Sequence, residues 1–264
     1  MNTTTKTLSA LAGLALVSGS ASAGLVAHWE FDNAADVGEA TVSSDLQAVG
    51  DAAYSAAGKV GGALALDGTG DYLRVDGSHT LAAGLPTGDA SYTTAAFIQT
   101  TQTSRQHIIT WGNTSTRQIN AFRTTTAGEA GIGNNSTVGI LNYNWGGGSN
   151  GDYGQGAGGD LTDGEWHHVA VTYDSATSTK RLYFDGVELG SGLVVANDLN
   201  VQATNFGIGY AFNTELFNGL IDDVRVYDEA LDQTAIAGLA AIPEPSSLAL
   251  LGLGGLLVAR RRRG

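Results

Sequence analysis

The chain has 264 residues, of which 26 are acidic and only 13 are basic, and its formal net charge is −13 at pH 7. A surface this acidic repels polyanions, which excludes nucleic acid as a partner and makes anionic lipid a poor one. The sequence contains no cysteine, so disulfides are excluded, and apolar burial, with or without a metal ion, has to stabilise the fold.

The first 23 residues have the pattern of a secretory signal peptide. A single charge at Lys6 precedes an apolar stretch from Leu8 to Val17, and Ala21-Ser22-Ala23 supplies the small residues of a cleavage site. We expect signal peptidase to cut after Ala23, so that the exported mature chain begins at Gly24.

Residues 24–242 are predicted to form one domain made almost entirely of strands. Segments rich in β-branched and aromatic residues alternate with Gly, Asn and Asp, which is typical of antiparallel strands and their turns. The predicted strands are 25–31, 63–66, 72–75, 91–100, 107–111, 118–123, 138–145, 166–173, 181–184, 205–210 and 216–227. Only 232–240 has a helical pattern, with Asp232 as its N-cap and Ile236 and Leu239 on one edge. This order predicts an all-β, two-sheet antiparallel jelly-roll sandwich with a short C-terminal helix.

The C-terminal segment 243–264 is predicted to be a signal separate from the folded domain. Pro243, Glu244 and Pro245 precede an apolar run from Ser246 to Ala259, and the cluster Arg260 to Arg263 follows. As a helix, this run spans about 21 Å, which is shorter than the roughly 30 Å hydrocarbon core of a bilayer. A processed transmembrane segment is therefore favoured over the alternative, a permanent tail anchor.

The order of these three parts resembles the PEP-CTERM sorting signal of Gram-negative bacteria that make extracellular polysaccharide. The resemblance implies transient insertion in the inner membrane, with the arginines on the cytoplasmic side. It also implies removal of the segment by an exosortase at or near the Pro-Glu-Pro motif. The protein would then reach the cell surface or the extracellular matrix.

Five blocks of the central segment resemble the LamG-like, concanavalin A-like jelly-roll domains. They begin with Leu-Val-Ala-His-Trp-Glu-Phe-Asp and include Asp-Gly-Thr-Gly-Asp-Tyr-Leu, and they occupy residues 25–32, 62–73, 163–174, 182–186 and 218–231. The resemblance implies two curved antiparallel sheets, of which the concave one often binds a ligand and the convex one often carries calcium.

In similar jelly rolls the calcium ion ties the first strand to the last. The matching positions here are Glu30, Asp32, Asp67, Gly68 and Asp222. They offer the carboxylate and carbonyl oxygens that Ca²⁺ prefers. Asp222 is the favoured ligand, and the alternative is a structural aspartate that pairs with an arginine or accepts hydrogen bonds from the backbone.

Aromatic side chains provide the candidate carbohydrate-binding residues, because their faces stack on pyranose rings. The candidates are Trp111, Tyr143, Trp145 and Tyr153. Trp145 directly precedes the segment 146–159, in which 8 of 14 residues are glycine. We interpret this segment as a mobile rim that is too flexible to form a strand. For Trp111 and Tyr143 the alternative is a place in the core.

A catalytic function is disfavoured by the pattern of carboxylates. Laminarinase-type hydrolases of this architecture carry Glu-x-Asp-x-x-Glu or Glu-x-Asp-x-Glu on one strand, and the only comparable string, Glu30-Phe31-Asp32, lacks the second glutamate. The sequence therefore predicts a non-catalytic protein that binds extracellular polysaccharide or mediates adhesion. A glycoside hydrolase or polysaccharide lyase and a purely structural matrix protein are the alternatives. Two carboxyl groups roughly 5 to 9.5 Å apart in the ligand groove would favour a hydrolase.

Processing at both ends is the first testable prediction. Intact mass spectrometry of the protein from its native host is expected to find a chain that begins at Gly24 and ends near Pro245. Replacing Glu244 is expected to leave the precursor in the inner membrane. A secreted chain that still carries Arg260 to Arg263 would contradict the sorting prediction.

Overall fold

A computed structural model describes residues 24–77, 79–129, 136–145, 150–211 and 215–241. The predicted cleavage site at Ala23, the motif residues Pro243, Glu244 and Pro245, and the apolar C-terminal helix lie outside these residues. Within them, no helix is long and apolar enough to cross a membrane.

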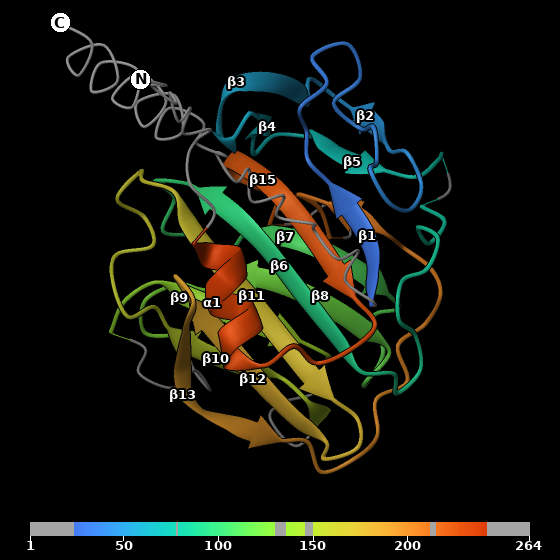
Figure 1. Cartoon of the computed structure of the whole chain (residues 1–264), viewed down its shortest axis with the longest axis vertical. Coiled ribbons are helices and arrows are strands. Elements are labelled where there is room, and N and C mark those ends of the chain that lie inside the picture. The colour runs from blue at the N-terminus through green and yellow to red at the C-terminus, as the bar shows by residue number, and fades with distance from the viewer. Residues whose placement is uncertain (1–23, 78, 130–135, 146–149, 212–214, 242–264) are drawn as a thin grey trace, which may run out of the picture.

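Sheet A contains eight antiparallel strands in the described part of the chain. Its order is β13 (Val187–Val194), β12 (Thr179–Phe184), β11 (His167–Asp174), β6 (Tyr92–Gln99), β15 (Asn218–Tyr227), β4 (Gly62–Asp67) and β3 (Ala53–Val60). The first strand, β1 (Leu25–Trp29), pairs with β15, so the two ends of the domain lie side by side (Figure 1).

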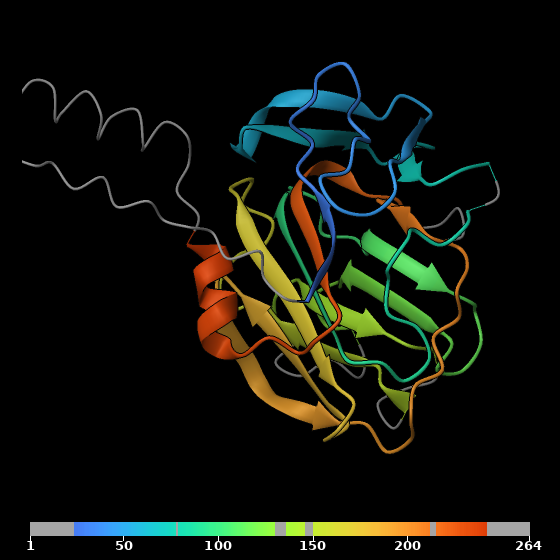
Figure 2. The same cartoon turned by 45° about the vertical axis from the view of Figure 1, so that its right-hand side comes forward.

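Sheet B contains seven antiparallel strands among the described residues. Its order is β10 (Tyr153–Gly156), β9 (Gly139–Tyr143), β8 (Ile119–Thr124), β7 (His107–Gly112), β14 (Gly207–Ile208), β5 (Tyr72–Arg74) and β2 (Gln47–Val49). The two sheets form separate layers with the core between them (Figure 2). The predicted all-β jelly-roll sandwich is therefore confirmed.

The core between the sheets is filled by alternate side chains of the central strands, because neighbours in a strand point to opposite faces. Val169 and Val171 of β11 enter it from sheet A, and Phe122 of β8 enters it from sheet B. Trp29 of β1 packs on Phe206 with a ring-centroid distance of 5.4 Å. This packing fixes which residues of each strand face outward.

Helix α1 (Gln233–Ala240) covers part of the outer face of sheet A (Figure 1). Asp232 caps it, as the sequence predicts, by accepting a 2.8 Å hydrogen bond from the backbone N–H of Ala235. Ile236 is completely buried in a small cluster with Ala95, Ala170 and Tyr183. A second, minor core therefore lies outside the sandwich.

Four strands are absent from the sequence prediction: β2, β3, β10 and β13. Each of them ends one of the two sheet orders. Three of them, β2, β3 and β13, consist mostly of exposed or half-buried residues, so their sequences lack a clear apolar alternation.

The glycine-rich segment needs a specific correction. We interpreted 146–159 as too flexible to form a strand, yet Tyr153–Gly156 is β10 and pairs with β9 in antiparallel register. At Gly151 of this segment close approach requires glycine, since its φ is +100° and a Cβ there would lie 2.8 Å from Asn144 Oδ1.

We predict that Ile236→Ala lowers the free energy of unfolding by about 2–5 kcal/mol, the usual cost of truncating a fully buried isoleucine. Urea denaturation measures this change. Thr234→Ala, on the exposed side of the same helix, is the control and is expected to change stability by no more than about 0.5 kcal/mol. Equal effects of the two variants would show that α1 does not pack on the sheet.

Candidate functional site

The outer face of sheet B carries a group of polar and aromatic side chains that face away from the core. On β8, Asn120 and Phe122 point inward, so Arg123 points outward. The strand register places His107 of β7 opposite Arg123 and Tyr143 of β9 opposite Ala121. Three neighbouring strands thus contribute to one surface.

A pocket of about 270 Å³ lies on this face. It is lined by Arg105, His107, Ile119, Arg123, Glu129, Tyr143, Trp145, Ala211 and Glu215. Five of these side chains carry titratable charges or a histidine ring, and two are aromatic. The pocket is therefore mixed in character, with an aromatic side and a charged side.

Trp145 forms the exposed part of the aromatic side. It is 42% exposed, which is unusual for so large an apolar side chain. Its ring meets that of Tyr143 edge to face, with centroids 5.6 Å apart and planes at 65°. The guanidinium of Arg123 lies 5.8 Å from the centre of the Tyr143 ring. These contacts hold the aromatic side against the charged side.

The charged side consists of paired groups. Arg123 Nη2 lies 2.7 Å from Glu129 Oε1, and both side chains are almost fully buried. Arg105 lies 3.2 Å from Glu129 and 3.5 Å from Glu215. His107 Nε2 lies 3.2 Å from Glu215 Oε2. Two arginines therefore balance two glutamates, and the cluster has little net charge.

The pKa values of these groups follow from the pairing. Burial by itself would raise the pKa of Glu129, but the hydrogen bond and the charge of Arg123 bring it below its ordinary value. The hydrogen bond from His107 lowers the pKa of Glu215. Burial lowers the pKa of His107, which keeps its ring neutral at pH 7. Both carboxylates are thus held in the ionised form.

Two of the predicted sugar-binding residues lie in the core, where neither ring can stack on a sugar. Trp111 is 1% exposed, and its indole N–H donates to the carbonyl oxygen of Pro86 at 2.9 Å. Tyr153 is 7% exposed, and its hydroxyl donates to the carbonyl oxygen of Leu189 at 3.2 Å. The sequence identifies aromatic residues, but only the strand register decides which face of the sheet they occupy.

The charged residues of the pocket were not identified from the sequence. Arg105, Glu129 and Glu215 come from segments far apart in the chain and follow no recognisable spacing. The one available signal is Arg123, the single charged residue of its strand. Such a position is costly unless a partner is near, and this predicts a paired charge but not the identity of its partner.

The predicted calcium ligands divide into separate places. Asp222 accepts a 2.8 Å hydrogen bond from the N–H of Val60, and Asp32 accepts a 2.6 Å bond from the N–H of Gly62. These two carboxylates therefore hold the turn between β3 and β4. Asp222 thus accepts from the backbone, as its alternative interpretation describes. Its other oxygen, Oδ1, is buried without a hydrogen-bond partner, and burial raises the pKa of this residue to about 7. Glu30 accepts a 2.8 Å bond from the hydroxyl of Thr41.

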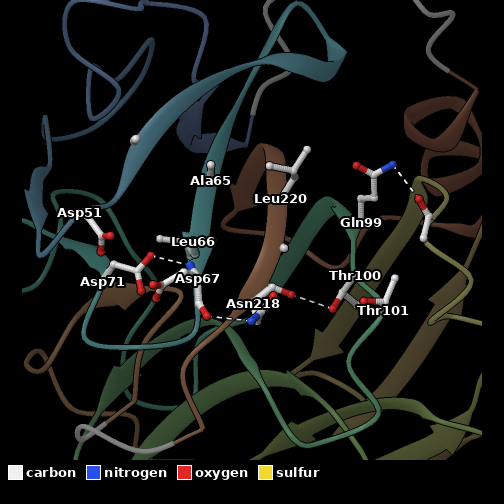
Figure 3. A pocket seen from close by; sticks show the side chains of 13 residues that line it. Asp51, Ala65, Leu66, Asp67, Asp71, Gln99, Thr100, Thr101, Asn218 and Leu220 are labelled. Carbon is white, nitrogen blue, oxygen red and sulfur yellow. Dashed lines mark hydrogen bonds between the residues drawn. The ribbon is translucent and has the colours of Figure 1, made fainter.

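Asp67 lies in a different acidic group, at one end of a hollow of about 620 Å³ on the outer face of sheet A (Figure 3). Carboxylate oxygens of Asp51, Asp67 and Asp71 all lie within 4.8 Å of one another. Asp71 is buried, which raises its pKa, and it accepts a 2.6 Å bond from the N–H of Asp67. Gly68 occupies the turn after β4 with a φ of +80°. Among the described residues this is the one acidic group with metal-binding proportions.

Comparison with known protein families gives two matches. The model of the concanavalin A-like lectin/glucanases superfamily matches residues 67–237, and the PEP-CTERM protein-sorting motif matches residues 241–263. The second match indicates export and implies processing by an exosortase. No curated protein matches the sequence.

Several solved structures share the fold. Domain 4 of AbnA, a GH43 extracellular arabinanase from Geobacillus stearothermophilus, was solved in complex with arabinotriose. It is 23% identical over 82% of this chain and 98% of that one, with a TM-score of 0.61. The binding domain of Paraclostridial Mosquitocidal Protein 1 is 10% identical over 82% of this chain and 52% of that one, with a TM-score of 0.56. The binding domain of botulinum neurotoxin serotype D is 11% identical over 82% of this chain and 50% of that one, also with a TM-score of 0.56.

These likenesses concern the fold, and the family match covers most of the sandwich. The chain belongs to the concanavalin A-like lectin/glucanases superfamily.

Proposed function

We propose that the exported domain binds neutral extracellular polysaccharide, without cleaving it, in the pocket on the outer face of sheet B. The observation that carries this proposal is the exposed indole of Trp145 at the rim of a pocket whose charged side chains are all paired. After signal peptidase and exosortase have acted, the protein would serve at the cell surface or in the extracellular matrix.

The chemistry of the pocket suits a sugar. An exposed aromatic face stacks on the C–H groups of a pyranose or furanose ring. Arginine supplies only hydrogen-bond donors and an ionised glutamate supplies only acceptors, so Arg105 and Glu215 can address the hydroxyls on either side of that ring. Both are partly exposed, with side-chain exposures of 45% and 29%.

The charge balance favours a neutral polymer. The paired pocket offers no excess positive charge, and the whole chain is strongly acidic. A polyuronate would meet this negative field without a compensating cluster of free arginines. A neutral polysaccharide avoids that repulsion. The arabinanase domain, which has the same fold, was solved in complex with the neutral sugar arabinotriose, and this supports the choice of a neutral polymer.

The glutamate pair is the feature that favours a hydrolase, and its electrostatics argue against that activity. A glycosidase needs one carboxyl group with a raised pKa, which donates a proton to the leaving oxygen. The pKa values of Glu129 and Glu215 are both lowered by their arginine and histidine partners. Neither residue is poised as a general acid at neutral pH, which supports a binding role.

We predict that Trp145→Ala abolishes retention on the host's own polysaccharide and on arabinan, the neutral probe. Because the Trp145 side chain is half exposed, the melting temperature of the variant is expected to stay within about 2 °C of that of the wild type. Affinity electrophoresis and thermal melting measure the two effects. Trp111→Ala is the control for the melting measurement. Because Trp111 is buried, its truncation is expected to cost about 3–5 kcal/mol of stability, in contrast to Trp145→Ala.

Three results, from a product-release assay and from the retention measurements, would contradict the proposal. Release of reducing sugars or unsaturated products by the wild type would identify a hydrolase or a lyase. Stronger retention on alginate than on arabinan would exclude the preference for neutral polymers. No retention of the wild type on any polysaccharide would favour a purely structural matrix protein.

Calcium binding, which the resemblance implies, is a second proposal. The three carboxylates of Asp51, Asp67 and Asp71 form the donor set that fits Ca²⁺, because this ion takes oxygen ligands. When bound there, the ion would neutralise carboxylates that otherwise repel one another and would join the turn after β4 to the start of β3.

The test is chelation. A cation that binds only the folded state at a hundredfold excess over its Kd adds about 2.7 kcal/mol of stability. EDTA is therefore expected to lower the melting temperature of the wild type and to leave Asp67→Asn unchanged. Asp222→Asn locates the ion, because a loss of the EDTA effect in this variant alone would place it at the β3–β4 turn. If EDTA leaves the melting temperature of the wild type unchanged, calcium sites at both the Asp67 group and the β3–β4 turn are excluded.

A further inference from the structure

Lys180 is a buried lysine that crosses the core from one sheet to the other. It starts from β12 of sheet A and has no exposed surface. Its Nζ donates hydrogen bonds to Asn144 Oδ1 and, at 2.7 Å, to the carbonyl oxygen of Gly151. These two acceptors lie on either side of Trp145 in the sequence. One amine therefore joins the chain before the exposed indole to the chain after it.

Each polar group of Asn144 makes a hydrogen bond, and together these bonds fix the residue. Its side-chain NH₂ donates to the carbonyl oxygen of Ile119 at 2.5 Å, and its backbone N–H donates to Asp152 Oδ1 at 2.7 Å. Its carbonyl oxygen accepts a 2.7 Å bond from the N–H of Arg117. The residue is completely buried, so a broken bond would leave a buried polar atom unpaired.

The backbone at Trp145 is in a conformation that needs such support. Its φ is +67°, in the left-handed region that bulky residues rarely adopt. Strain of this kind persists only where the surrounding structure enforces it. Gly151 is equally constrained, because its φ is +100° and a Cβ there would lie 2.8 Å from Asn144 Oδ1.

We infer that Lys180 is a positioning residue for the pocket. By holding Asn144 and Gly151, it fixes the backbone of Trp145 so that the indole meets Tyr143 at the rim. Lys180 touches no ligand itself. This inference deepens the proposed function. Only its polysaccharide-retention measurement rests on that function, because the contacts of Lys180 exist with or without a sugar.

The contact does not depend on the charge of Lys180. Burial lowers the pKa of this lysine to about 7, although the charge of Asp152 opposes the shift. A second titratable group against it is Tyr173, whose ring centre lies 5.9 Å from Nζ and whose pKa burial raises. A neutral amine keeps two N–H donors, and Nζ has two acceptors here. The amine can therefore hold both acceptors on either side of neutral pH.

The test is Lys180→Met, which removes the two donors and keeps most of the apolar side chain. Trp29 and Trp111 are buried, so in a Trp166→Phe background acrylamide quenches mainly Trp145. We expect quenching of this emission to rise, its anisotropy to fall, and arabinan retention to weaken about tenfold. Ile236→Ala is the control, because it destabilises the outer face of sheet A and leaves the contacts of Lys180 in place.

Gly151→Ala provides a second variant if Lys180→Met does not fold. Its methyl group would displace the acceptor Asn144 Oδ1 without removing a core side chain, so the same change in Trp145 quenching is expected. Quenching and anisotropy equal to those of the Ile236→Ala control would overturn the inference. If the wild type binds no polysaccharide, the proposed function fails, and the fluorescence still decides the role of Lys180.

Discussion

The outer face of sheet B is positioned by the side chains that the same strands send into the core. Phe122 and Asn120 of β8 point inward, and Arg123 can then only point outward. The bulge in β7 sets His107 opposite Arg123 and leaves Ile108 and Ile109 in the core. Packing of the sandwich thereby decides the composition of the pocket, and a slip of one residue in register would bury its charges.

The pocket combines groups that are costly to bury with partners that offset the cost. Arg123 and Glu129 are both nearly inaccessible, and each would be strongly unfavourable without the other. Arg105 and Glu215 continue the pairing toward solvent. A surface of this kind has many directed donors and acceptors and little net field, which suits hydroxyl groups better than ions.

A second polar group lies between the sheets, beneath the aromatic rim. Tyr92 of sheet A donates to Asn142 of sheet B at 2.8 Å, and Asn142 donates to Asn120 at 2.6 Å. Lys180 and Asn144 extend this contact toward Trp145. Polar contacts inside an apolar core have strict geometry, because misaligned groups there lose their hydrogen bonds without gaining water. They suit the task of fixing an exposed ring.

The sequence by itself determined the fold class, the inner strands, the capped helix at Asp232 and the C-terminal sorting signal. These features depend on local composition, periodicity and order. It also placed Trp145 among the candidates, although part of the glycine-rich segment after it forms the strand β10. The edge strands β2, β3 and β13 were not predicted because their mostly exposed or half-buried residues give no apolar alternation.

Only the tertiary structure decided which residues share a surface. It placed Trp111 and Tyr153 in the core, divided the predicted calcium ligands between separate places, and joined Arg105, Glu129 and Glu215 into one cluster. The physical reason is that side-chain direction and partner depend on strand register and on contacts between distant segments. Neither is encoded in the spacing of residues along a single strand.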